Sequence, residues 1–150
     1  MKAVIVYYSE HHGNTKKLLD KIAAECGADL INAVDTKEAD LSKYELIGFA
    51  SGIYFSKFHK SVLDFTEHNL PEGKRVFFIY TCGSKGRKNY TETIRTVVAG
   101  KNAEIAGEYG CLGFDTYGPF KLVGGIAKGH PDEQDIANAV GFYKSITAKS

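Results

Sequence analysis

The sequence predicts one α/β domain, residues 1–150, in which helices cover both faces of a mostly parallel β-sheet. Strand-like and helix-like segments alternate along the chain, which is the order of βαβ units with right-handed crossovers. The first segment is a continuous β-branched and aromatic run, typical of a strand buried on both faces. A length of 150 residues, with 43% hydrophobic and 25% charged residues, suits a single domain with a real core.

The strands are expected at residues 2–8, 29–34, 45–50, 74–81 and 104–112. The strongest pattern is the fourth, in which Val76, Phe77, Phe78 and Ile79 follow one another without a polar break. Uninterrupted apolar runs of this length indicate strands of a parallel sheet that is covered on both faces.

The helices are expected at residues 15–26, 40–44, 57–69, 90–99 and 131–147. The first has Leu18 and Ile22 on one face, and Gly27 follows where a left-handed residue commonly ends a helix. The third carries Phe58 and Val62 on its apolar face. Pro131 opens the last helix, and the acidic residues after it favour a helix N-terminus through the dipole.

Composition excludes several classes of protein. The net charge is +1 and there is no basic block, so nothing favours nucleic-acid binding. The apolar runs are too short to span a membrane, and the first residues enter a strand without a signal-peptide pattern. We therefore expect a cytoplasmic protein that contacts no membrane. The widely spaced Cys26, Cys82 and Cys111 argue against a disulfide framework or a zinc site.

Ligands of an open parallel sheet bind beyond the carboxyl ends of its strands. Loops 9–15, 51–57 and 82–90 follow such ends, and the long Gly-rich stretch 113–129 would be able to close over them. The first loop (SEHHGNT) leads from a strand into a helix, so its backbone N–H groups and the positive helix end form an anion cradle. The alternative is an ordinary capped turn, with Asn14 or Thr15 as the N-cap.

The chain resembles the flavodoxin family along its whole length. Gly13, Asn14 and Thr15 match in place the end of that family's phosphate loop, Ser/Thr-x-Thr-Gly-Asn-Thr. Residues 51–54 (SGIY) resemble the loop that sets an aromatic ring against the isoalloxazine, and 80–84 (YTCGS) resemble the Cys-Gly-Asp loop of short-chain flavodoxins. The resemblance implies a three-layer, doubly wound sandwich with a five-stranded parallel sheet in the order 2-1-3-4-5, and a non-covalently bound FMN.

The resemblance also implies which residues contact FMN. They are Ser9, Glu10, His11, His12, Gly13, Asn14, Thr15, Ser51, Gly52, Ile53, Tyr54, Phe55, Cys82, Gly83, Ser84 and Tyr90. Tyr54 is the first candidate to stack on the flavin ring and Phe55 the second, with Tyr90 as a weaker one. The alternative for Tyr54 and Phe55 is that both are core aromatics capping a strand.

The first loop departs from the family pattern, because Glu10, His11 and His12 stand where flavodoxins have hydroxyl residues. The Glu10 carboxylate would be repelled by a phosphate, so its side chain is expected to point away while its peptide still donates. A histidine donates through its ring N–H and, as a cation, favours a dianionic phosphate. The alternative is that both histidines are ordinary surface residues.

Three rival readings are disfavoured. A cysteine phosphatase needs five residues between its Cys and Arg, whereas Cys82 and Arg87 are separated by four. A receiver-type signalling domain needs a phosphoacceptor Asp after the third strand, where this chain has Ser51. His59, His68 and His130 lack metal-ligand spacing, and His59 is expected on the surface.

The expected function is that of an electron carrier between redox partner proteins, in which the flavin supplies the chemistry and no side chain is catalytic. The alternatives are an FMN-dependent reductase of a quinone or another small molecule, and a binding module without flavin. Carriers of this family tend to be strongly acidic, so a net charge of +1 slightly favours the reductase or an unusual partner. A monomer or weak homodimer is expected.

Overall fold

The computed structural model describes residues 2–9, 13–83, 89–113 and 129–148. The strands are β1 (Ala3–Tyr8), β2 (Asp29–Asn32), β3 (Leu46–Tyr54), β4 (Lys57–Phe58), β5 (Arg75–Cys82) and β6 (Glu104–Leu112). The helices are α1 (Asn14–Cys26), α2 (Lys60–Asn69), α3 (Glu92–Ala99) and α4 (Glu133–Thr147). None of the helices in the described ranges is long and apolar enough to cross a membrane.

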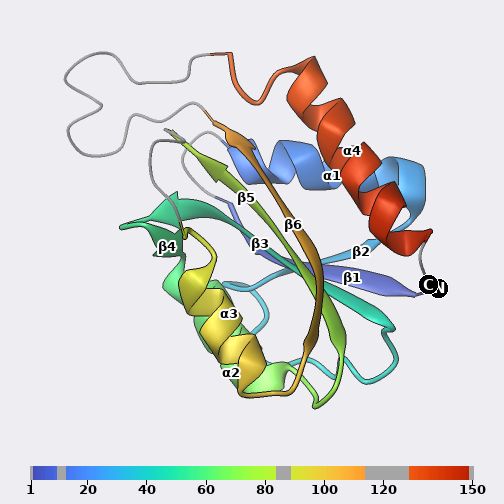
Figure 1. Cartoon of the computed structure of the whole chain (residues 1–150), viewed down its shortest axis with the longest axis vertical. Helices are drawn as coiled ribbons and strands as arrows, with labels where there is room; N and C mark the ends of the chain where they lie inside the picture. Colours follow the sequence, from blue (N-terminus) through green and yellow to red (C-terminus); the bar gives the residue numbers. More distant parts are fainter. Residues whose placement is uncertain (1, 10–12, 84–88, 114–128, 149–150) are drawn as a thin grey trace.

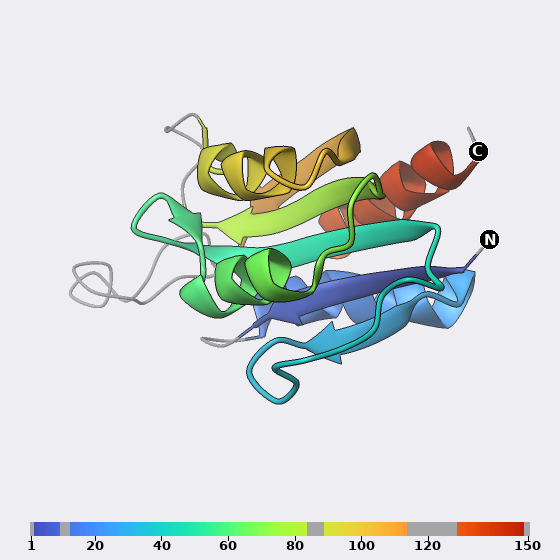
Figure 2. The same cartoon turned by 90° about the horizontal axis from the view of Figure 1, so that it is seen from below.

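The predicted fold class is confirmed. All neighbours along the order β2-β1-β3-β5-β6 are parallel, and Figures 1 and 2 show helices on both faces of the sheet. The sheet differs from the predicted order 2-1-3-4-5 by one additional strand, because the short β4 pairs antiparallel with the end of β3 and takes the fourth place in the sequence.

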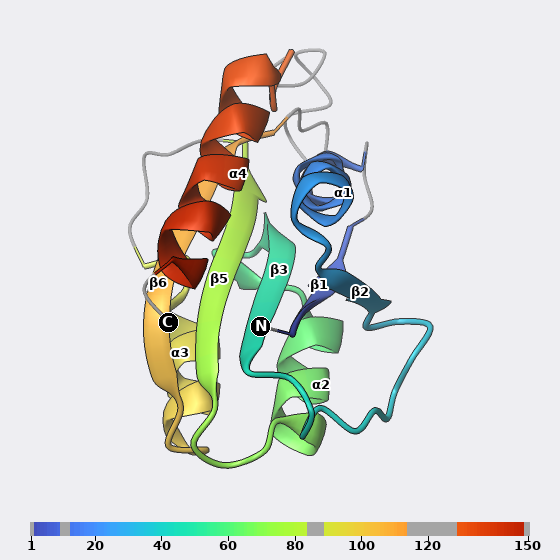
Figure 3. The ribbon, with the colours of Figure 1, turned by 90° about the vertical axis from the view of Figure 1, so that its right-hand side faces the viewer.

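Two cores fill the space between the layers. Helices α1 and α4 lie side by side on one face of the sheet (Figure 3), where Leu18, Ile22 and Val140 pack against Phe77 and its neighbours. Helices α2 and α3 cover the other face, where Val62 and Ile94 join a second cluster. The helical spacing of these apolar residues therefore identified the buried faces correctly.

Large aromatic rings lie over glycines of the adjacent strand on both faces of the sheet. Gly48 of β3 is paired with Phe77 of β5, and a Cβ at Gly48 would lie 2.3 Å from the Phe77 ring. Gly110 of β6 is paired with Tyr80 of β5, where the corresponding distance is 2.1 Å. Because the two glycines have no side chain, there is room beside them for the two rings.

The predicted helix at 40–44 is wrong. The Asp40 carboxylate accepts a hydrogen bond from the Ser42 amide at 3.0 Å, and the Tyr44 amide donates to the Leu41 carbonyl at 3.1 Å. An aspartate that bonds to the backbone two residues later forms a local turn, which competes with a helix.

The predicted helix at 57–69 begins three residues late, because Lys57 and Phe58 pair with the end of β3. The strand predicted at 45–50 extends to Tyr54 for the same reason. Phe58 is buried as expected, but in a strand. The strand predicted at 29–34 ends at Asn32, whose side chain accepts from the Val34 amide at 2.9 Å.

Helix α4 begins in a capping box. The Asp132 carboxylate accepts from the Asp135 amide at 2.8 Å, and the Asp135 carboxylate accepts from the Asp132 amide at 2.9 Å. The His130 ring nitrogen Nδ1 lies 2.6 Å from the same Asp135 carboxylate. Reciprocal bonds of this kind satisfy two backbone donors at a helix start.

Replacing Gly48 by Ala should destabilise the fold. The new methyl group would overlap the Phe77 ring in a fully buried site, and overpacking of this kind costs about 1–3 kcal/mol. The measurement is the free energy of unfolding by urea titration. Gly52→Ala is the matched control in the same strand, because its nearest atom, in the Tyr54 ring, is 3.4 Å away. Equal losses in the two variants would contradict the packing argument.

The stability of the protein should fall in acid partly through Asp135. Burial by itself raises the pKa of this carboxyl, but the hydrogen bonds from His130 and the Asp132 amide outweigh burial and hold the pKa below its ordinary value of 3.8. A carboxyl with a lowered folded-state pKa stabilises the fold at higher pH and loses that contribution as pH falls through the folded pKa. We therefore expect Asp135→Asn to flatten the decline in unfolding free energy below pH 3.8. An unchanged acid slope in urea titrations would refute this role.

Candidate functional site

The carboxyl ends of the parallel strands meet at one edge of the sheet, toward which the arrowheads of β5 and β6 point in Figure 1. At this edge the chain leaves β1 toward β2 on one side and leaves β3 toward β5 on the other. Open α/β sheets bind ligands at such a switch point. The structure therefore brings the predicted loops after β1, β3 and β5 to the same edge.

The first loop turns into α1 through Gly13, which is the N-cap and has a left-handed φ of 65°. The cap makes no side-chain hydrogen bond. Instead, the Ser9 hydroxyl accepts from the Lys16 amide at 3.1 Å. The alternative in which Asn14 or Thr15 is the N-cap is wrong, because both residues already belong to the helix.

The first two residues of α1 point into the protein. Thr15 is only 1% exposed, and its hydroxyl lies 2.9 Å from the hydroxyl of Thr81 in β5. Asn14 is also buried, and a Cβ added to Gly113 after β6 would lie 2.7 Å from the Asn14 amide nitrogen. The beginning of α1 is thus fixed against the ends of β5 and β6.

The second loop is a tight hairpin between β3 and β4. Tyr54 pairs with Lys57, so Phe55 and Ser56 form a two-residue turn with left-handed φ values of 53° and 66°. This is the backbone of a type I′ turn, which usually contains Asn and Gly. Two non-glycine residues in this region cost of order 1–3 kcal/mol each, a strain typical of functional sites.

Ser51 holds this hairpin in place. Its buried hydroxyl accepts from the His59 amide at 3.0 Å and donates to the Gly52 carbonyl. The side chain of Ser51 is therefore structural, whereas its predicted contribution to a ligand was through the backbone. Since the Gly52 carbonyl accepts from Ser51, the peptide after Gly52 is oriented by the hairpin.

An aromatic cluster of Tyr8, Tyr54 and His59 supports the same loop. The Tyr8 and His59 rings are stacked, with centroids 3.6 Å apart and planes 5° apart. Tyr54 packs edge-on against both rings, at 5.7 Å from Tyr8 and 5.2 Å from His59. Phe55 is 80% exposed at the tip of the hairpin. His59, which is expected on the surface, is half-buried there and has a structural role as well, because it caps α2 through its Nδ1.

The third loop begins at the end of β5. Cys82 is buried, and its thiol donates to the Cys111 carbonyl at 3.7 Å. Tyr90 is buried too, with its ring edge-on to that of Tyr80 at 5.7 Å. Burial, and then the Glu108 carboxylate, raise the pKa of Tyr80, which keeps its phenol neutral. In this structure the Tyr90 ring is packed inside, whereas Gly83 lies at the half-exposed edge.

Several predicted contacts lie outside the described residues. These are Glu10, His11, His12, Ser84 and residues 114–128 of the long Gly-rich stretch. Among the described positions, Ser9, Gly13, Ile53 and Gly83 lie at the strand ends together with the residues discussed above. The contacts of all these residues with a ligand stay predictions.

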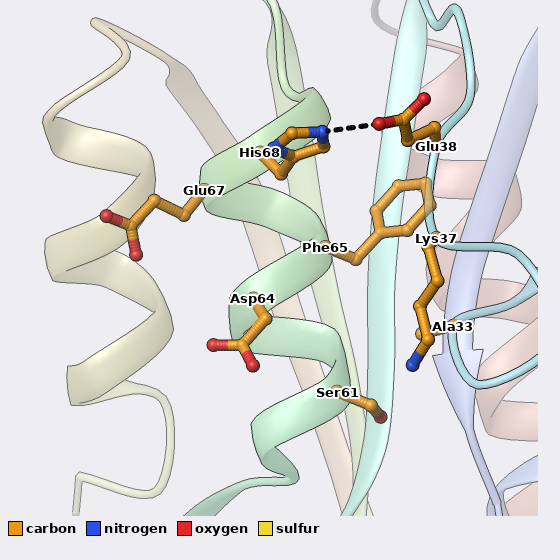
Figure 4. Close-up of a pocket in the computed structure, with 8 residues that line it drawn as sticks. All are labelled: Ala33, Lys37, Glu38, Ser61, Asp64, Phe65, Glu67 and His68. Carbon is orange, nitrogen blue, oxygen red and sulfur yellow. Dashed lines mark hydrogen bonds and ion pairs between the residues drawn. The ribbon is translucent and has the colours of Figure 1, made fainter.

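Two other features lie outside these three loops. A cavity of about 550 Å³ borders α2 (Figure 4), where the carboxylates of Glu38, Asp64 and Glu67 outnumber the basic side chains of Lys37 and His68, which disfavours an anion there. The atoms of His130, Asp132 and Asp135 that bind metals in other proteins lie within 4.8 Å of one another. The capping box of α4 accounts for their proximity.

The sequence did not single out Tyr8, the inward contact of Thr81 or the role of the Ser51 hydroxyl. Tyr8 and Thr81 lie within apolar strand runs, where their patterns indicate burial and nothing more. Their partners, His59 and Thr15, are distant in the sequence. No rule of sequence spacing identifies such pairs. The only signal was that Tyr8 and Thr81 each end a predicted strand, and ligand-binding loops follow strand ends.

The hydroxyl pair of Thr15 and Thr81 should be energetically coupled. Each single replacement by Val leaves the other buried hydroxyl without this partner, which costs about 1–3 kcal/mol. The double variant should lose less stability than the sum of the two single losses. Urea titrations of the four proteins measure the coupling. Additive losses would show that the two hydroxyls do not depend on one another.

Comparison with known proteins agrees with this architecture. The flavodoxin domain profile matches residues 5–119. The chain is 44% identical over 147 residues to an uncharacterized protein of Methanocaldococcus jannaschii, covering 97% of this chain and 98% of that protein.

Similar folds occur in oxidised flavodoxin 1 of Bacillus cereus (TM-score 0.69, 16% identity, 98% of both chains) and in a flavodoxin of Streptococcus pneumoniae (TM-score 0.68, 20% identity, 100% of both chains). At these identities the similarity shows the fold alone. The match to the flavodoxin profile extends over most of the chain, from β1 to beyond β6. The protein therefore belongs to the flavodoxin domain family.

Proposed function

We propose that the protein binds FMN without a covalent bond and carries electrons between redox enzymes. The observation that carries this proposal is the start of α1 at the switch point of the sheet, where Gly13 turns the chain in the left-handed conformation. Helix geometry leaves the first N–H groups of a helix without a carbonyl partner in that helix. Together with the helix dipole, they suit a phosphate.

The donor set at this position fits a phosphate group. It combines the backbone of Gly13 with the hydroxyl of Ser9, and no carboxylate belongs to it within the described part of the loop. The Ser9 hydroxyl accepts from the Lys16 amide and still has its own proton to donate. The buried Thr15 hydroxyl is bonded to Thr81 and fixes the start of the helix. Gly13 carries no side chain that would keep a phosphate from the backbone.

The hairpin after β3 would hold the ring system. Exposure favours Phe55 as the aromatic side chain against the flavin, because Tyr54 is engaged with Tyr8 and His59. Tyr54 would then support Phe55 from behind. The Ser51 hydroxyl fixes the loop through its bonds to the Gly52 carbonyl and the His59 amide, so the peptides of Gly52 and Ile53 are held at the edge where the ring would lie.

FMN, when bound, supplies electron transfer through its isoalloxazine ring. The residues of this chain bind the phosphate, orient the ring and shield it from water, and none of them is required as an acid or base. The near-neutral net charge of +1 favours a second function, reduction of a quinone or similar small molecule, because it offers little electrostatic steering toward a charged protein partner. The redox partner and the cytoplasmic location stay predictions.

The protein should bind FMN at least about a hundredfold more tightly than riboflavin, which lacks the phosphate. Charge-assisted hydrogen bonds contribute about 1.5–3 kcal/mol each, and a hundredfold corresponds to about 2.8 kcal/mol. Titration calorimetry with each flavin measures the ratio. Equal affinity for the two flavins would refute the phosphate cradle, and no binding of either would favour a binding module without flavin.

Gly13→Ala should weaken binding of FMN by about tenfold and leave riboflavin unaffected, because the added methyl group would keep the phosphate from the backbone N–H groups. Gly27→Ala at the opposite end of α1 is the matched control. Its φ of 78° imposes the same strain, and both glycines have open space where a Cβ would lie.

Rapid NADH or NADPH oxidation with a quinone, without an added reductase, would favour the reductase over the carrier.

A further inference from the structure

A groove of about 570 Å³ runs along the outer side of the layer formed by α1 and α4. Its floor consists of Ile136 and Val140, and the exposed Ala137 and Gly141 form its α4 side. The groove differs from the cavity beside α2, whose lining is rich in carboxylates. A surface of this kind, apolar in the middle and charged at its ends, is typical of protein interfaces.

Within the described part of the chain, nothing packs against the position that a side chain at Gly141 would occupy. It lies in the middle of α4, and an added Cβ would meet no atom within 4 Å. A glycine at such a position weakens a helix relative to alanine. Contacts with the described residues therefore do not explain this glycine, whereas a second helix approaching closely from outside would.

The two ends of the groove carry opposite charges, so the grooves of two copies that lie antiparallel are complementary in charge. Glu133 lies in the first turn of α4 and Lys144 in its last turn, about 17 Å apart along the helix axis. Two copies of α4 that pack antiparallel across a two-fold axis place Glu133 of each copy opposite Lys144 of the other. The same axis passes close to Ala137 and Gly141, which allow the helices to approach.

The remaining charges do not oppose this arrangement. On α1, Lys21 and Glu25 pair with each other at 3.5 Å, so that rim is neutral. A net charge of +1 produces little repulsion between two copies. A second copy of the chain thus offers charges that are complementary to those of the groove.

We propose that the α1–α4 groove is the interface of a weak, symmetric homodimer in which the two α4 helices pack antiparallel. The contact is isologous, so each residue pair occurs twice. The interface leaves the strand ends to the flavin and its partners, and it does not depend on the proposed function.

Sedimentation equilibrium of the whole protein, from micromolar to millimolar concentration, tests the proposal. The average mass should rise from 16.4 kDa toward twice that value. Glu133→Lys and Lys144→Glu should each raise the dissociation constant at least about tenfold, because each change replaces two attractive pairs by two repulsive ones. The double variant with both changes should restore the wild-type constant.

Glu92→Lys is the matched control. Glu92 lies in the first turn of α3, so its carboxylate interacts with the dipole of that helix as the Glu133 carboxylate does with the dipole of α4. This variant should dimerise like the wild type. Gly141→Gln, which keeps the helix and adds bulk, should also abolish dimerisation. A protein that stays at 16.4 kDa over the whole range, or a double variant that fails to restore association, would overturn the proposal.

Discussion

The beginning of α1 is the constraint on which the other features of the site depend. Three other segments meet it: Ser9, which directly follows β1, and two that are distant in the sequence, β5 through Thr81 and the residue after β6, Gly113. Because the Thr15 hydroxyl is buried and bonded, the helix cannot shift along its axis without breaking this contact. The orientation of the amides at the helix start is therefore set by the fold before any ligand arrives, which reduces the ordering cost of binding.

The hairpin after β3 depends on the same edge but is built differently. There the contacts are aromatic and local, with Tyr8, Tyr54 and His59 packed around a strained two-residue turn. The fixed start of α1, which follows β1, and the strained turn that follows β3 therefore lie close together at the switch point, because β1 and β3 are neighbouring strands. Rigid anchoring suits a phosphate, and an exposed aromatic tip suits a flat ring.

The fold class was predictable because buried strands and amphipathic helices leave distinct patterns in the sequence. Element boundaries were predicted wrongly where a side chain bonds to the nearby backbone, and where burial alone does not distinguish a strand from a helix. Asp40 favours a turn over the expected helix by bonding to Ser42, and Phe58 is equally buried in a strand or a helix. At the site, Gly13, Asn14 and Thr15 were recognisable as a motif. That Thr15 points inward to Thr81, and that His59 stacks on Tyr8, depends on tertiary contacts that no local pattern contains.

The pairing of glycines with aromatic rings in the sheet has a consequence for sequence divergence. Gly48 and Phe77 share one volume, and Gly110 and Tyr80 share another, on opposite faces of the same sheet. Within each pair, growth at one position is tolerated only together with shrinkage at the other. Relatives that keep this sheet should therefore change the two members of a pair jointly, and the interior will drift through exchanges of volume between neighbouring strands rather than through independent substitutions.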